Sequence, residues 1–135
     1  MRSASEEKDA VCELLAEYCF RLDDGRFAEM AALFTEDGTW DTAFGRAVGR
    51  TAIAELARSL RERAGADRPR GVHLVTNIVV ALDGERGNVR SNWMVMQNDA
   101  AGPKIGSGGA YLDDIVKTAE GWRFRRRKID RFIAP

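Results

Sequence analysis

The chain has 135 residues and a mass of 15.0 kDa, which suits one ordinary domain that buries about two thirds of its unfolded surface. Hydrophobic residues make up 44% and charged residues 31%, so the composition excludes a disordered chain and predicts one domain over residues 1–135. Basic and acidic residues both number 21, and this zero net charge argues against a nucleic-acid partner, which requires a basic surface.

Two helices are expected near the beginning of the chain. Between Ser5 and Asp24, apolar residues recur at steps of three and four, which predicts an amphipathic helix ended by Gly25. A shorter apolar stripe from Phe27 to Phe34 predicts a second helix that ends at the turn of residues 36–38. The two helices should form a hairpin.

A short strand and a third helix follow. Residues 39–44 are typical of a strand, and the glycine-flanked residues 45–49 of a loop. The buried stripe of the third helix is predicted from Ile53, Leu56, Ala57 and Leu60. Residues 61–71 are charged and indicate a loop.

The second half of the chain is rich in strand-forming residues. Four stretches, separated by turn residues, cover 72–82, 88–97, 105–116 and 122–133, and they predict an antiparallel meander. The glycines of residues 106–109 indicate a bend or bulge in the third stretch. The fold class is therefore α+β, with the helices covering one face of a curved antiparallel sheet.

The sequence gives little support for a disulfide, a metal site or a membrane span. Cys12 and Cys19 lie seven residues apart on one predicted helix, about 10 Å along its axis, which is too far for a disulfide. One histidine and no Cys-x-x-Cys motif do not make a histidine-rich or thiolate metal site, so we expect chemistry without metal or cofactor. No apolar run reaches the about 20 residues of a membrane span, and the first ten residues lack an apolar signal core, so we expect a cytoplasmic protein without a membrane partner.

Asp23 and His73 are the strongest candidates for chemistry. On a helical wheel Asp23 falls on the side of Cys19, whereas Asp24 falls on the charged side and should face water. A buried carboxylate needs a partner, and His73 is the one histidine of the chain. A carboxylate on one imidazole nitrogen fixes the tautomer and leaves the other nitrogen to accept a proton. The plainer alternative is a capping aspartate and a hydrogen-bonded structural histidine.

Further candidates follow from alternation and composition. Strand alternation puts Asn77 on the same face as His73, and Tyr18 lies on the apolar side of the first helix. Several large apolar side chains are candidates to line a pocket, although such residues more often form core: Trp40, Phe44, Trp93, Met94 and Met96. The basic run of residues 123–128 is typical of a solvated face with a few ion pairs.

Four segments, taken in order, resemble the nuclear transport factor 2-like superfamily in its SnoaL-like branch. They are YCFRLDDGRFAEMAALFTEDGTWD, GRTAIAEL, HLVTN and GGAYLDDIVKTAEGWRFRRRKI, and the match spans nearly the whole chain. The resemblance implies a cystatin-like, cone-shaped sheet around an apolar pocket that three N-terminal helices close.

Within this branch the chain is most similar to the scytalone dehydratase, hexachlorocyclohexane dehydrochlorinase and bile-acid dehydratase group. That likeness implies a catalytic pair of Asp23 and His73, a substrate-facing Tyr18, and a substrate contact by Arg127. Alternation alone puts Arg127 opposite Trp122, so its inward direction requires a bulge or a concave face on its own side. The second histidine of scytalone dehydratase is missing, and Tyr18, Tyr111 or water is left as the proton donor.

The expected function is that of a cofactor-independent lyase, a dehydratase or similar, acting on a small hydrophobic cyclic substrate. His73 would remove a proton from carbon, while Tyr18 and Asn77 would bind an oxygen on which charge develops. An isomerase or an aldol-type cyclase with the same pair, and a non-catalytic binding or assembly module, are the alternatives. Apolar residues on the outer face of the meander predict a homo-oligomer. The resemblance to the dehydratase group implies a trimer or a dimer.

Overall fold

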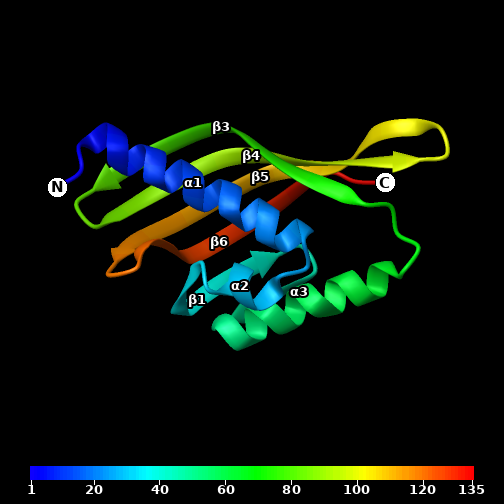
Figure 1. Cartoon of the computed structure of the whole chain (residues 1–135), viewed down its shortest axis with the longest axis horizontal. Coiled ribbons are helices and arrows are strands. Elements are labelled where there is room, and N and C mark those ends of the chain that lie inside the picture. Colours follow the sequence, from blue (N-terminus) through cyan, green and yellow to red (C-terminus); the bar gives the residue numbers. More distant parts are fainter.

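Three helices and two short strands precede four long strands in the computed structural model, which describes residues 1–135 (Figure 1). The elements are α1 (Ala4–Asp23), α2 (Phe27–Ala31), β1 (Phe34–Thr42), β2 (Gly45–Val48), α3 (Arg50–Ala64), β3 (Gly71–Asp83), β4 (Arg86–Asp99), β5 (Gly102–Thr118) and β6 (Gly121–Ile133). The expected α+β class with N-terminal helices and a curved sheet is confirmed.

The six strands form one sheet in the order β2-β1-β6-β5-β4-β3. The four long strands form the expected antiparallel meander, but β1 and β6 run parallel, so the sheet is not purely antiparallel. The predicted loop of residues 45–49 is instead the strand β2, which pairs with β1. The second helix ends at Ala31, because Phe34 joins β1 and packs against Phe124 of β6 with ring centroids 5.1 Å apart.

Helix α1 is fixed to the sheet at its N-terminal end. The Ser3 hydroxyl caps the helix by accepting a hydrogen bond from the Glu6 amide at 3.1 Å. The Glu7 carboxylate then accepts bonds from the Lys117 ammonium at 2.6 Å and the Trp122 indole at 2.5 Å. The apolar stripe of the helix, with Val11, Leu14, Leu15 and Tyr18, is buried in the core between the helices and the sheet.

Bulges decide which side chains face the helices. In β3 the pairing with β4 shifts between Thr76 and Val79, and Asn77 has the left-handed φ of 54°. In β6 the pairing with β5 shifts between Phe124 and Arg126. In β5 the pairing shifts at the predicted glycine segment, where a Cβ on Gly109 would lie 1.9 Å from the Asp130 carbonyl oxygen. Of the bend or bulge expected from these glycines, the bulge is therefore confirmed.

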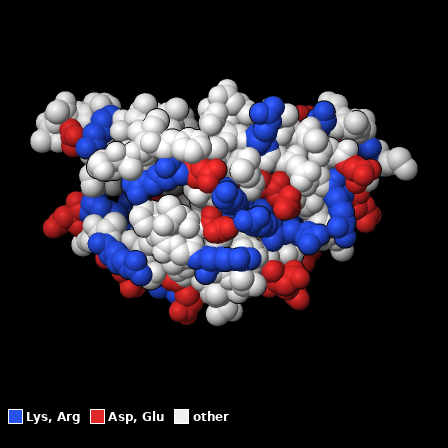
Figure 2. All heavy atoms as spheres, turned by 180° about the vertical axis from the view of Figure 1, so that it is seen from behind, with Lys and Arg blue, Asp and Glu red and all other residues white.

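The outer face of the sheet carries exposed apolar side chains. Val72, Met96 and Ile105 lie in register across β3, β4 and β5, and all three are exposed. Seen from behind, acidic and basic side chains are interspersed among other residues (Figure 2).

None of the helices has the length and apolar character that a membrane span needs.

Candidate functional site

A cavity of about 340 Å³ lies between the helices and the inner face of the sheet. Thirteen of its 23 lining residues are hydrophobic, and they come from all three helices and from the sheet. Its volume falls within the range of about 300–1,000 Å³ that is usual for small-molecule sites. The cavity is therefore the candidate functional site.

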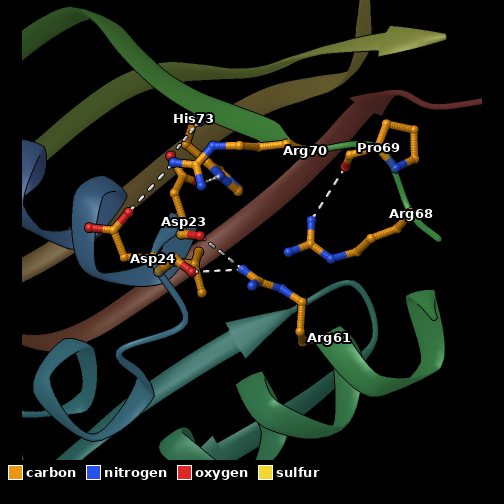
Figure 3. Close-up of polar contacts among 8 residues, drawn as sticks. Asp23, Asp24, Arg61, Arg68, Pro69, Arg70 and His73 are labelled. Atoms are coloured by element: carbon orange, nitrogen blue, oxygen red, sulfur yellow. Dashed lines mark hydrogen bonds and ion pairs between the residues drawn. The ribbon is translucent and has the colours of Figure 1, made fainter. Parts of the chain in front are cut away.

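Asp23 and His73 meet at the wall of this cavity (Figure 3). One carboxylate oxygen, Oδ2, accepts the backbone N–H of His73 at 2.8 Å, and the other, Oδ1, lies 2.5 Å from imidazole Nδ1. Because an ionised carboxylate only accepts, the hydrogen bond assigns the proton of the neutral ring to Nδ1 and leaves the Nε2 lone pair free. The side chains are 9% and 23% exposed, respectively, so water has limited access to the pair.

The end of helix α1 holds Asp23 in place. The Arg61 guanidinium of α3 donates to the Leu22 carbonyl at 2.9 Å and to the Asp23 carbonyl at 3.4 Å, which satisfies acceptors at the helix end. Asp24 turns outward, with a side chain 46% exposed, and lies 3.6 Å from the Arg70 guanidinium (Figure 3). The predicted inward direction of Asp23 and outward direction of Asp24 are both confirmed.

Tyr18 brings a hydroxyl to the cavity from the middle of α1. Its oxygen accepts the Trp40 indole N–H at 3.0 Å, and both residues line the cavity. Burial raises the pKa of the Tyr18 hydroxyl far above its ordinary value, so the phenol stays protonated. Because the oxygen is bonded only as an acceptor, its O–H is left to donate to a ligand.

An aromatic wall continues from His73 across the sheet. The His73 ring stacks on Trp93 with centroids 6.2 Å apart, and Trp93 stacks on Tyr111 at 5.9 Å. All three rings line the cavity. Burial raises the pKa of the Tyr111 hydroxyl as well. The wall offers a flat apolar surface, next to the imidazole, on which a planar ring can lie.

Arg127 lies beneath this wall and does not line the cavity. The side chain is 0% exposed and forms two hydrogen bonds with the Asp113 carboxylate, at 2.8 and 2.9 Å. Its guanidinium carbon lies 4.3 Å from the ring centroid of Tyr18 and 3.7 Å from that of Tyr111. The bulge in β6 turns Arg127 inward, and a bulge was the condition under which alternation allowed that direction. The expected contact with substrate is corrected, because Arg127 lies under the two tyrosines and outside the cavity lining.

Three other predicted contacts also lie outside the cavity. Asn77 is turned away by the bulge in β3, and its amide donates to Asn92 at 2.9 Å. Met94 and Met96 alternate with the inward-facing Trp93 and so point to the outer face of β4. These corrections remove all three from the expected binding set. Trp40, Phe44 and Tyr111 do line the cavity.

Sequence reasoning missed several polar side chains of the lining. Gln97 lies four residues after Trp93 on β4, so strand alternation predicts that both side chains face the cavity. Its amide packs against Gly106, where a Cβ would lie 2.6 Å away. Arg61, Arg68 and Arg131 also line the cavity, and no pattern in the sequence marked them. No three His, Cys, Asp or Glu side chains gather as ligands for a metal ion.

Known proteins resemble the chain over most of its length. The model of the SnoaL-like domain family matches residues 3–128. The uncharacterized protein Rv2910c of Mycobacterium tuberculosis is 32% identical over 133 residues, which cover 94% of this chain and 88% of that protein.

Solved structures resemble the fold closely. The structure of a variant of Rv3472, a function unknown protein from Mycobacterium tuberculosis, has a TM-score of 0.83 and 29% identity, covering 96% of this chain and 76% of that chain. An NTF2-like protein with a cystatin-like fold from Novosphingobium aromaticivorans has a TM-score of 0.80 and 26% identity, covering 91% of this chain and 80% of that chain. These likenesses support the fold and do not identify a reaction.

Proposed function

The chain belongs to the SnoaL-like domain family of the nuclear transport factor 2-like superfamily, and on this premise we propose that it is a cofactor-independent lyase for a small hydrophobic cyclic substrate. The observation that carries the proposal is the contact of Asp23 with His73 at the wall of a largely apolar cavity. That contact orients a neutral base toward the space in which a substrate would lie.

His73 acts as the base in the proposed reaction. Its Nε2 takes a proton from a carbon next to a carbonyl, and the electron pair moves toward the carbonyl oxygen. Asp23 keeps the ring oriented and stabilises the imidazolium that forms. The Tyr18 O–H donates a hydrogen bond to the oxygen on which charge develops. Asn77 takes no part, because its side chain is bonded to Asn92 outside the cavity.

The leaving group departs in the second half of the reaction. The enolate electrons form a carbon–carbon double bond, the bond from the β-carbon to its hydroxyl breaks, and the hydroxide takes a proton. The raised pKa of the Tyr18 hydroxyl makes it a poor acid, so the His73 imidazolium returns the proton and water is released. The base is thereby regenerated, and the overall change is the loss of one water molecule.

The test uses a panel of cyclic β-hydroxy ketones, with formation of the conjugated enone followed by its ultraviolet absorption. We expect His73→Ala to lower turnover by about 10²-fold to 10⁴-fold, the usual contribution of a general base. Met96→Leu, on the outer face, is the matched control and should keep wild-type turnover. If His73→Ala keeps most of the activity of wild type, the assignment of the base is wrong.

The same panel separates the two alternative functions. An isomerase converts the substrate without a change in mass, whereas a dehydratase releases water, so mass spectrometry of the product distinguishes these reactions. A binding module takes up members of the panel and converts none of them. A base and a hydroxyl donor in one cavity favour a catalyst over a binding module.

A further inference from the structure

The charged side chains of the cavity lining are mostly cationic. Arg61, Arg68 and Arg131 line the cavity, and Asp23 is the one carboxylate among the lining residues. With His73 neutral, three positive charges and one negative charge give the lining a formal charge of plus two. The whole chain has a net charge of zero, so this excess is local to the cavity.

The three guanidinium groups are not equally free. Arg61 bonds the end of α1, and its guanidinium carbon lies 5.3 Å from the centroid of the Phe27 ring. Arg68 donates only to the carbonyl of the next residue, at a long 3.4 Å (Figure 3). Arg131 lies over the Phe44 ring at 5.0 Å. No carboxylate of the protein pairs with Arg68 or Arg131, although Arg70 pairs with Asp24.

The two unpaired arginines, Arg68 and Arg131, come from different parts of the fold. Arg68 follows α3 in the segment that leads to β3, and Arg131 lies near the end of β6. Both are half-buried and line the same cavity. A guanidinium offers five N–H donors in a planar fork that matches an anionic oxygen pair, and most of these donors are unused here. The arrangement suits a ligand that carries a negative charge into the cavity.

We propose that the substrate is an amphipathic anion, with an apolar ring against the aromatic wall and an anionic group, such as a carboxylate, bound by Arg68 and Arg131. This inference rests on the proposed function, because it names the substrate class of the same cavity. The positive lining also attracts anionic ligands over a distance, an effect that weakens as salt is added.

Two fluorescent probes of nearly the same shape test the proposal without a known substrate. Both 8-anilino-1-naphthalenesulfonate and N-phenyl-1-naphthylamine are apolar and aromatic, and only the first carries an anionic group. We expect the anionic probe to displace the neutral one from the wild-type protein. We also expect Arg131→Gln and Arg68→Gln each to weaken the anionic probe about fivefold to tenfold, while the affinity of the neutral probe changes less than about twofold.

Two variants serve as controls. Arg90→Gln removes a charge from an exposed position of β4 that does not line the cavity, and it should change neither affinity. Arg131→Lys keeps the charge and should keep most of the affinity for the anionic probe. Equal loss of both probes, unchanged binding of the anionic probe in both glutamine variants, or a failure of the probes to compete would overturn the proposal.

The outcome is separable from that of the proposed function. If the probes behave as expected while His73→Ala keeps full turnover, the anionic ligand class stands and the lyase assignment fails. If His73→Ala loses turnover while the two glutamine variants bind the anionic probe as wild type does, the assignment of the base stands and the anionic substrate is refuted.

Discussion

The buried pair of Arg127 and Asp113 supports a prediction that separates a structural arginine from a ligand-binding one. Both side chains are fully buried, and two hydrogen bonds join them. Asp113→Asn leaves the guanidinium buried without a counter-charge, and Arg127 cannot escape this by losing its proton, because a guanidinium stays protonated throughout the ordinary pH range. In Arg127→Met the unpaired charge is instead that of the Asp113 carboxylate, which can become neutral by taking up a proton.

The expected size follows from these charges. Breaking a buried ion pair by removing one partner costs about 3–5 kcal/mol of the free energy of unfolding. An unfolding entropy of about 2.1 cal/mol/K per residue over 135 residues converts this into a fall in Tm of about 11–18 °C. Replacing both residues, as in Asp113→Leu with Arg127→Met, should recover much of the loss, because no charge is then left unpaired.

The two single variants should differ in their response to pH. Burial raises the pKa of the Asp113 carboxyl above its ordinary value of 3.8, and loss of Arg127 raises it further. A carboxyl whose pKa is raised by folding binds more protons in the folded state, so its penalty is small at low pH and grows as the pH rises. Arg127→Met should therefore lose less stability at about pH 5 than at about pH 8, whereas Asp113→Asn has no carboxyl at this position that could take up a proton.

Urea unfolding followed by tryptophan fluorescence measures both effects, since the chain has three tryptophans. Arg126→Met is the matched control, because Arg126 lies on the same strand and forms a half-exposed pair with Asp41 that is worth at most about 1 kcal/mol. A cost below about 1 kcal/mol for Asp113→Asn, or the same cost for Arg127→Met at both pH values, would refute the reasoning.

Two further predictions concern the helix anchor and the outer face. Hydrogen bonds from Lys117 and then Trp122 lower the pKa of the Glu7 carboxyl, so its stabilising contribution is complete above 4.5 and is lost as the pH falls through the lowered value. Glu7→Gln should therefore unfold at lower urea than wild type at about pH 7, with a smaller difference at about pH 3; an equal difference at both would contradict this. The apolar row of Val72, Met96 and Ile105 should be covered in a dimer or trimer, which Ile105→Lys should weaken. Light scattering tests this, and a 15 kDa particle for wild type at micromolar concentration would contradict it.

The helical wheel predicted the inward direction of Asp23, and His73 followed as its partner because it is the one histidine of the chain. Both residues precede any irregularity in their elements. The wheel of α1 is regular up to Asp23, and β3 is regular from Gly71 to Thr76. Asn77 was misplaced because alternation assumes an unbroken strand, and a bulge starts at that residue. A bulge depends on strand pairing across the sheet, which the local sequence does not show.

The cavity lining was harder to predict for two different reasons. Met94 and Met96 were grouped with Trp93 by their apolar character, although alternation on one strand separates them. Arg68 and Arg131 are more than sixty residues apart, and nothing local to either one indicates that they line the same space. Their shared position is a product of the tertiary fold.

Helix α1 is tied to the sheet at both of its ends, by Glu7 at the start and by Asp23 at the finish. The first tie spans 110 residues of sequence and the second spans 50, so neither forms before distant parts of the chain have met. Contacts between residues far apart in the sequence slow folding, because closing a long loop costs entropy before the contact forms. The oriented imidazole therefore arises only when the helix docks on β3, and the return of the proposed lyase activity during refolding should report that docking step directly.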